Sequence, residues 1–389
     1  MIDVFFWVQH LLGVGHLTRA ATLVRAMRRH GLEVTLASGG LPVSGLDLAG
    51  GELLQLAPVQ CPAGDFSRLL DERGAPVDAA FRGRRTRMLA EAFAARRPRL
   101  LLLEMFPFGR RQMRFELDPL LEAARARVPR PPIVASVRDI LVQGRKPGRE
   151  AEMLERALGF DAVLVHGDPA LVPFGATFPL SARLGRRLIH TGYVVEPRPC
   201  DDGAGDGADG EGEIIVSAGG GRVGERLLAT AIRAQALVPD GPAWRLLVGW
   251  HVSAADFEAL ARHARPGLVV ERARADFRSL LGRAALSVSQ GGYNTVAEVL
   301  EAGCQAIVVP YAEGGETEQA LRARLLAERG LLQILEADGL DAAGLARAIG
   351  AALARPAGTA PPPCMNGADV TARLLGRLAR PTNERVRCP

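Results

Sequence analysis

Short apolar runs recur along the chain between stretches with helical periodicity. Six lie before residue 195 and five after residue 212: "DVFFWV", "EVTLAS", "RLLLLE", "PIVAS", "DAVLVH" and "RLIHTGY", then "EIIVS", "WRLLVG", "GLVVE", "ALSVS" and "QAIVVP". The runs are continuous rather than alternating, which is typical of parallel strands buried on both faces. Such strands, alternating with helices, predict a doubly wound α/β unit in each half.

The two halves are separated by a stretch that does not suit a core. Residues 196–212 are rich in Gly, Pro and acidic side chains, which favour a linker over a regular element. We therefore expect two Rossmann-like doubly wound parallel-sheet domains, residues 1–195 and 213–365, that face each other across a cleft. Residues 366–389 are expected to form a final amphipathic helix and a tail.

Positive charge is concentrated in the first half of the chain. The net charge is +5, Lys146 is the sole lysine, and arginines crowd residues 82–99 and 108–114. These segments suit a solvated face, or contact with an anionic membrane surface or a phosphorylated acceptor. No aromatic residues are interleaved as in nucleic-acid-binding segments, so nucleic acid is not an expected partner.

Other features of the sequence indicate the compartment. No apolar run approaches the roughly 18 residues needed to span a bilayer, and the N-terminus lacks a basic leader region. The five cysteines are scattered without a C-x-x-C pair, which suits free thiols and no zinc site. We expect a cytoplasmic protein, with peripheral association at the inner face of the membrane left open.

The first candidate site is the glycine turn in "GVGHLTRAATLVRAMRRHG", between a strand and a helix. Gly13 and Gly15 permit a tight turn and close approach to a ligand. His16 falls at the helix N-terminus, where the dipole disfavours the imidazolium and helps to keep the ring neutral as a base. The alternative is a histidine that caps the turn for structural reasons.

A second glycine turn opens the other half, in "SAGGGRVGERLLATAIRAQ". Backbone amides of Gly219, Gly220, Gly221 and Arg222 at a helix start suit a diphosphate, and the Arg222 side chain adds charge. The stretch lacks the G-x-x-x-x-G-K-[ST] pattern of a P-loop, which argues against ATP chemistry.

Residues 287–330 carry a third group of polar and glycine positions after two strands. Glycines turn the chain, polar side chains are expected to cap the next helix, and carboxylates and an amide suit hydroxyl groups of a ribose or a hexose. Favourable charges in helix first turns are the alternative for the two glutamates. The candidates are Gly291, Gly292, Asn294, Thr295, Glu298, Glu318 and Gln319.

In this order and spacing, the three groups resemble the GT-B glycosyltransferases of family 28, the MurG-type lipid N-acetylglucosaminyltransferases. A group of bacterial predicted glycosyltransferases is more similar still, in "EMFPFGRRQMRFEL", "VRDIL" and "SQGGYNT". The resemblance covers nearly the whole chain and implies a GT-B fold. It also implies a UDP-linked sugar donor, an N-acetylhexosamine among the sugars considered, and no cofactor besides this co-substrate.

The resemblance also implies roles for individual residues. His16 acts near the acceptor hydroxyl, and the turn from Gly219 to Gly221 cradles the diphosphate. Glu298 binds the ribose, and the pair Glu318 and Gln319 contacts the donor sugar. Backbone contacts to the base come from around Arg274 to Phe277. On the acceptor side we expect Glu104, Phe106 and Arg138.

Two positions depart from the family pattern, so the donor sugar is not carried over. Glu318 replaces the first of two glutamines, and Arg322 replaces an asparagine. Retaining GT-B enzymes usually have a glutamate eight residues before the ribose-binding one, and Gln290 stands there, which favours inversion. No D-x-D metal clamp is seen near a predicted strand end.

We therefore expect an inverting, metal-independent glycosyltransferase with a UDP-sugar donor and a small-molecule or lipid-linked acceptor. Two alternatives stay open. A UDP-sugar hydrolase of related fold would pass the sugar to water, and a nucleotide-sugar binding protein would keep the site without turnover.

Overall fold

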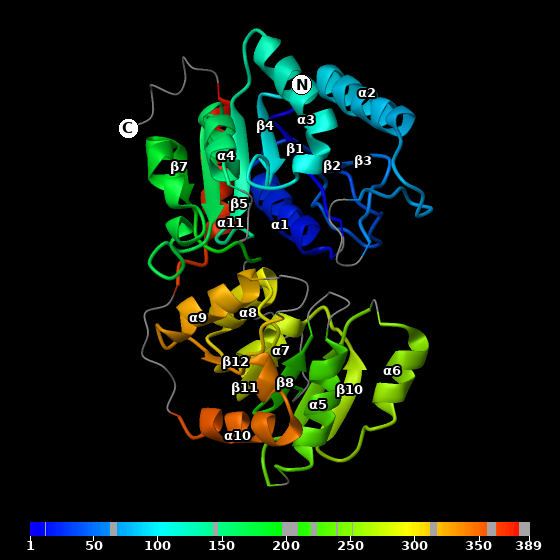
Figure 1. Cartoon of the computed structure of the whole chain (residues 1–389), viewed down its shortest axis with the longest axis vertical. Coiled ribbons are helices and arrows are strands. Elements are labelled where there is room, and N and C mark those ends of the chain that lie inside the picture. Colours follow the sequence, from blue (N-terminus) through cyan, green and yellow to red (C-terminus); the bar gives the residue numbers. More distant parts are fainter. Residues whose placement is uncertain are drawn as a thin grey trace. The chain divides into compact units, whose positions relative to one another are not determined.

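The computed structural model describes residues 1–11, 13–62, 68–142, 147–196, 209–218, 224–238, 240–250, 252–311, 317–355 and 363–380. The chain forms two compact units, coloured by sequence in Figure 1. The first contains Met1–Glu196 and the chain from Asn366 onward, and the second contains Pro197–Met365. Each unit holds one parallel sheet, which confirms the predicted pair of doubly wound domains.

The first sheet has the strand order β3-β2-β1-β4-β5-β6-β7, and all of its pairs are parallel. The order reverses between β1 and β4, and ligands bind outside the carboxyl ends of the strands at such a switch point. The strands are β1 Val4–Val8, β2 Val34–Ser38, β3 Glu52–Gln55, β4 Leu100–Glu104, β5 Ile133–Arg138, β6 Ala162–His166 and β7 Leu188–His190.

Helices cover both faces of this sheet because successive strand residues point to opposite faces. Phe5 and Trp7 of β1 belong to a core with α2, α3 and α4, whereas Val4, Phe6 and Val8 belong to a core with α1 and α11. The helices are α1 Gly15–Arg29, α2 Ala79–Arg96, α3 Arg114–Ala126, α4 Arg149–Leu158 and α11 Gly367–Ala379.

The last helix returns to the first unit after the chain has completed the second. The backbone N–H of Gly367 donates to the Tyr193 carbonyl at 3.0 Å, and the apolar face of α11 packs on α1. A Cβ atom at position 367 would lie 2.3 Å from the Gly192 carbonyl oxygen. Only glycine permits this approach, so Gly367 allows the start of α11 to lie against the backbone of Gly192 and Tyr193.

The second sheet has the order β10-β9-β8-β11-β12-β13, again all parallel, with its reversal between β8 and β11. Helices α5 and α10 share one core with this sheet, and α7 packs on α8. The strands are β8 Ile214–Ser217, β9 Trp244–Val248, β10 Leu268–Arg272, β11 Leu286–Ser289, β12 Ala306–Val308 and β13 Gln333–Ile334. The helices are α5 Glu225–Gln235, α6 Ala254–Ala261, α7 Phe277–Arg283, α8 Tyr293–Ala302, α9 Glu318–Ala327 and α10 Ala342–Leu353.

All eleven apolar runs form strands, and the structure adds two short strands that were not predicted, β3 and β13. Both lie at the edge of their sheets. In β3 the side chains of Glu52 and Leu53 are exposed, so this strand has no need of a continuous apolar run. Within the described ranges, no helix is both long and apolar enough to cross a bilayer.

One arginine of the basic segment 82–99 is not on the surface, contrary to the expectation of a solvated or membrane-facing stretch. Arg85 is fully buried and its Nε donates to Glu116 Oε2 at 2.5 Å, while its Nη2 donates to Gln9 Oε1 at 2.7 Å. The Trp7 indole N–H donates to Glu116 Oε1 at 3.0 Å. The side chain is held inside because it neutralises a buried carboxylate, whereas Arg84 and Arg87 are exposed.

We predict that Arg85→Ala destabilises the first unit by about 3–5 kcal/mol, because it leaves the Glu116 carboxylate buried without its partner. Urea denaturation followed by circular dichroism measures the change. The matched control is Arg87→Ala on the exposed side of α2, which should alter stability by less than about 0.5 kcal/mol. Equal effects of the two substitutions would contradict the role given to the buried pair.

Candidate functional site

The structure brings His16 and Glu104 together at the switch point of the first sheet. Strand β1 leads into α1, which begins at Gly15, and Glu104 is the last residue of the adjacent strand β4. His16 Nδ1 lies 2.7 Å from Glu104 Oε1. Arg19, three residues further along α1, also pairs with this carboxylate. The base candidate and an acceptor-side candidate thus form one cluster.

Glu104 determines which nitrogen of His16 carries a proton. Burial raises the pKa of Glu104, but the charges of His16, Arg19 and Arg110 outweigh burial and bring it to about 2. An ionised carboxylate can only accept hydrogen bonds, so His16 Nδ1 donates to it. The lone pair of His16 therefore lies on Nε2. This is the arrangement in which a carboxylate orients an imidazole as a base.

His16 is neutral near pH 7. Burial lowers the pKa of the imidazole to about 3, Glu104 opposes this shift, and Arg110 and Arg138 add to it. The sequence pointed to the helix dipole as the cause, but burial is the largest effect. The side chain retains 15% of its exposure, which leaves room for contact with a ligand.

Two arginines of this cluster were not singled out from the sequence. Arg19 lies three positions after His16, and this spacing on one helix face was a signal that was available. Arg110 donates from Nε to the Gln9 carbonyl at 2.8 Å, and no sequence pattern indicated it. Arg138, which was predicted, is the last residue of β5.

Two other histidines at strand ends are engaged in packing. His10 Nε2 lies 3.1 Å from the Leu41 carbonyl oxygen, and a Cβ atom at Gly40 would touch its ring. His166 is buried between the hydroxyls of Ser136 at 2.7 Å and Thr191 at 2.8 Å. Both rings therefore have structural contacts that account for them.

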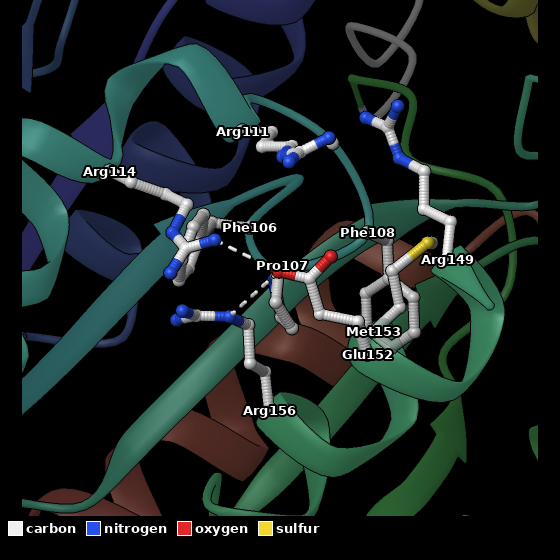
Figure 2. A pocket seen from close by; sticks show the side chains of 10 residues that line it. Phe106, Pro107, Phe108, Arg111, Arg114, Arg149, Glu152, Met153 and Arg156 are labelled. Carbon is white, nitrogen blue, oxygen red and sulfur yellow. Dashed lines mark hydrogen bonds and ion pairs between the residues drawn. The ribbon is translucent and has the colours of Figure 1, made fainter. Parts of the chain in front are cut away.

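The remaining candidates of the first unit differ in their surroundings. Gly13 is exposed, and a Cβ atom there would meet nothing within 4 Å, so packing does not require glycine. Gly15 opens α1. Phe106 is buried, with its ring centroid 6.4 Å from that of Phe160, as expected of a packing residue. Phe106 and the next two residues of its loop, Pro107 and Phe108, also line the pocket in Figure 2.

In the second unit, α9 packs closely on the turn that follows β11. A Cβ atom at Gly291 would lie 3.1 Å from Gln319 Cβ, so glycine allows the close approach. Gln319 Oε1 accepts from the Tyr311 N–H at 3.1 Å. Arg322 donates to the Gly291 carbonyl at 3.2 Å and lies 5.6 Å from the Tyr293 ring centroid.

Two predicted positions of this turn have a different role from the one expected. Gly292 is the N-cap of α8, which makes no side-chain cap hydrogen bond, and the helix begins at Tyr293. Asn294 and Thr295 therefore lie inside the first turn and do not cap it, because the helix starts before them. Glu318 opens α9 as predicted, but its side chain is only 1% exposed.

Glu298 lies in the second turn of α8 and is partly buried. Its carboxylate accepts no hydrogen bond from any residue that the structure describes. Burial raises its pKa to about 7, although Arg278 lowers it, and Glu301 raises it further. Arg278 instead forms an ion pair with Glu301 at 2.6 Å, and its Nε donates to Glu301 Oε2 at 3.3 Å. A carboxyl group with free acceptors and a pKa near neutrality is typical of a functional site.

Other donor-side candidates are less informative. Arg274 pairs with Asp276 at 2.6 Å and with Asp209 at 2.7 Å, and Phe277 is the first residue of α7. Gly219, Gly220, Gly221 and Arg222 lie outside the described residues. In the portion that the structure describes, no group of three or more His, Cys, Asp or Glu side chains is arranged to hold a metal ion.

Comparisons with known proteins identify the family of this chain. The model of the glycosyltransferase family 28 C-terminal domain matches residues 270–363. A UDP-N-acetylglucosamine--N-acetylmuramyl-(pentapeptide) pyrophosphoryl-undecaprenol N-acetylglucosamine transferase from Methylobacterium sp. is 31% identical over 334 residues, 81% of this chain and 79% of that protein. The enzyme of the same name from Paramagnetospirillum magneticum is 28% identical over 180 residues, 44% of this chain.

The coverage of these relatives is uneven. The chain spans 48% of the Paramagnetospirillum protein and 42% of a relative from Acidithiobacillus ferrooxidans. Among solved structures, MurG of Acinetobacter baumannii superimposes with a TM-score of 0.57 at 17% identity, over 96% of this chain and 95% of that one. This likeness shows the fold and confirms the predicted GT-B architecture.

The raised pKa of Glu298 predicts a pH-dependent effect on stability. Between pH 4.5 and about 7 the folded chain keeps a proton that the unfolded chain releases, so this group weakens folding increasingly as pH rises. Glu298→Gln removes the effect. Its advantage over the wild type should grow through this window to about 1–3 kcal/mol and then level off.

Thermal denaturation at pH 4.5, 6 and 8 measures this difference. The control is the same substitution at Glu258, which is exposed on α6. If the curves of Glu298→Gln and the wild type stay parallel with pH, Glu298 does not have the environment described.

Proposed function

Because this chain belongs to the MurG-type glycosyltransferases of family 28, we propose that it transfers a sugar from a UDP-sugar donor to an acceptor hydroxyl, with inversion and without a metal ion. One observation carries the proposal: His16 is neutral, oriented by Glu104, and placed at the carboxyl ends of β1 and β4. This position supports His16 as the base, because a parallel sheet binds its ligands at the carboxyl ends of its strands.

In the proposed reaction, His16 Nε2 takes the proton of the acceptor hydroxyl as its oxygen attacks the anomeric carbon. The bond from that carbon to the diphosphate oxygen breaks, and UDP leaves with the electron pair. Glu104 accepts the Nδ1 proton in a hydrogen bond throughout and stabilises the imidazolium that forms. Attack from the face opposite to the leaving group inverts the anomeric centre.

The proton transfer needs a stronger base than the unliganded site offers. Burial lowers the pKa of His16 most, Arg110 and Arg138 lower it further, and a base is most effective when its pKa lies near the working pH. An anionic ligand group beside these guanidinium groups would offset their charge and raise the pKa of His16. The site therefore suits a reaction in which a phosphate-bearing substrate is already bound when the proton moves.

We place the donor in the second unit. Among the described residues, none donates to Glu298, which leaves its oxygens for the two ribose hydroxyls. Gln319 lies against the Gly291 turn, and its amide nitrogen donates to no described residue, so it suits a sugar hydroxyl. The diphosphate is assigned to Gly219, Gly220, Gly221 and Arg222, and the base to the backbone from Arg274 to Phe277, both on the family resemblance.

Inversion without metal is supported by the sequence. Gln290 occupies the position of the second glutamate of retaining enzymes, and no D-x-D pattern follows a strand. In place of a metal, backbone amides at helix starts and Arg222 would stabilise the departing diphosphate.

The names of the relatives suggest the first substrates to test. They are transferases of N-acetylglucosamine to a pyrophosphoryl-undecaprenol carrier, so UDP-N-acetylglucosamine is the first donor and a lipid-linked diphosphate the first acceptor. Glu318 and Arg322 differ from the family pattern, so other UDP-sugars belong in the same panel. A lipid-linked acceptor would place the chain at the inner face of the membrane, where the exposed Arg84 and Arg87 suit anionic lipids.

The panel also separates the proposal from its alternatives. A transferase releases UDP rapidly only when an acceptor is present, whereas a hydrolase consumes the donor alone at full rate. A binding protein shows a thermal shift with UDP and no turnover. Absence of any shift with millimolar UDP or UDP-sugars would overturn the donor site itself, since a ligand at about one hundred times its Kd stabilises by about 2.7 kcal/mol.

We predict that His16→Ala lowers kcat about a hundredfold to ten-thousandfold while UDP affinity stays unchanged, because the base acts on the proton and the nucleotide binds elsewhere. UDP release and calorimetric titration measure the two quantities. Thr18→Ala, on the exposed side of the same helix, is the control. Near wild-type turnover of His16→Ala would leave His16 as a turn residue.

We predict that Glu298→Ala weakens UDP binding about tenfold to a hundredfold, because it removes two charge-assisted hydrogen bonds to the ribose. KM for the donor should rise with less effect on kcat, since these contacts are distant from the reacting carbon. Calorimetric titration of the folded variant with UDP checks this, with Glu258→Ala as the control. Unchanged affinity would remove Glu298 from the donor site.

A further inference from the structure

A pocket of the first unit lies between the loop that follows β4 and the start of α4 (Figure 2). About 310 Å³ of space there is free of protein atoms, and part of it is open to solvent. Pro107, Phe108 and Met153 give it an apolar side. Four guanidinium groups give it a strongly cationic side: those of Arg111, Arg114, Arg149 and Arg156.

Two of these arginines are neutralised by neighbouring carboxylates. Arg114 pairs with Glu152 at 2.9 Å and with Asp118 at 3.1 Å. Arg156 pairs with Asp118 at 3.0 Å and lies 3.7 Å from Glu152. Figure 2 shows both side chains converging on the Glu152 carboxylate from α3 and α4. This fixed network forms one wall of the pocket.

The other two arginines have no such partner. Arg111 is exposed and Arg149 is half-buried, and neither makes a hydrogen bond or ion pair with its side chain to any described part of the chain. In Figure 2 their guanidinium groups lie apart from the two contacts drawn to Glu152. Arg149 is also the first residue of α4, where the helix dipole favours an anion.

The charge of the pocket is therefore unbalanced. Four guanidinium groups stand against the carboxylates of Glu152 and Asp118, which leaves an excess of two positive charges. A phosphate monoester carries about two negative charges near neutral pH and accepts paired N–H donors from arginine. The apolar side formed by Pro107, Phe108 and Met153 suits the group to which the phosphate is esterified.

We propose that this pocket is a phosphoryl-binding site, in which Arg111 and Arg149 hold the phosphate and the apolar side holds its substituent. The site is separate from the His16 cluster, because it involves none of the side chains that contact His16 or Glu104. It does not depend on the proposed transferase activity. The ligand is either a soluble phosphorylated molecule or the phosphate of a lipid headgroup, which share this chemistry.

The test uses phenyl phosphate and inorganic phosphate as probes, titrated into the full-length chain at constant ionic strength and followed by calorimetry. Phenyl phosphate should bind more tightly than inorganic phosphate because of the apolar side. The double variant Arg111→Ala, Arg149→Ala should weaken phenyl phosphate binding by about tenfold or more, since it removes the two unpaired donors. Arg87→Ala, an exposed arginine on α2, should leave it unchanged.

A second arm identifies the source of the phosphate. Sedimentation with vesicles of phosphatidylglycerol or of phosphatidylcholine measures binding to lipid headgroups. Loss of phosphatidylglycerol binding in the double variant, but not in Arg373→Ala on the exposed side of α11, supports the site with a lipid as its ligand. Phenyl phosphate binding without vesicle binding supports it with a soluble ligand.

The proposal is overturned if the wild-type chain binds neither probe nor vesicles, or if the double variant binds them as well as the wild type does. His16→Ala should retain phenyl phosphate binding. This variant therefore distinguishes a failure of the pocket from a failure of the proposed transferase site.

Discussion

The contact between Glu104 and His16 organises the buried polar cluster at the switch point of the first sheet, on which the proposed chemistry depends. Parallel pairing of β1 with β4 places the buried carboxylate beside the first turn of α1, where it accepts from His16 Nδ1. The same carboxylate pairs with Arg19, and burial, with smaller contributions from Arg110 and Arg138, keeps the imidazole neutral. A single carboxylate thus fixes the tautomer of His16 and neutralises buried positive charge. It can do both because the pairing of β1 with β4 places it beside the first turn of α1.

Buried charge also holds the framework around this contact. Arg85 is enclosed by Glu116, Gln9 and the carbonyl oxygen of Gly39, and a Cβ atom at Gly39 would lie 2.1 Å from its guanidinium. Gln9 directly follows β1, and α1 begins at Gly15. The Arg85 network and the turn that carries His16 therefore lie on the same short segment of chain after β1. Rigidity at the carboxyl end of β1 is therefore supplied by polar contacts as well as by the apolar core.

In the second unit, the close approach of α9 to the backbone of a glycine turn holds the candidate site together, whereas buried charge does so in the first unit. Gly291 lets α9 pack against the turn after β11. Arg322 of α9 donates to the Gly291 carbonyl, and its guanidinium lies against the Tyr293 ring. No described residue donates a hydrogen bond to Glu298, whose pKa is near 7, an arrangement that costs stability and is typical of groups retained for binding. In the proposed function the two units supply complementary groups, a base in the first and hydroxyl-binding groups in the second.

The sequence by itself determined the eleven strands with continuous apolar runs, the glycine turns after them and the candidates His16, Glu104 and Glu298, because burial on both faces and tight turns leave local patterns. Only the tertiary structure decided what depends on distant residues. The edge strands β3 and β13, the burial of Arg85 and the return of α11 to the first unit are of this kind. So are the proton position on His16, set by a carboxylate 88 residues away, and the lack of a side-chain partner for Arg111 and Arg149 among the described residues. The charge state and exposure of a residue depend on the side chains that the fold places beside it. These neighbours are distant in sequence, so the local sequence pattern does not predict them.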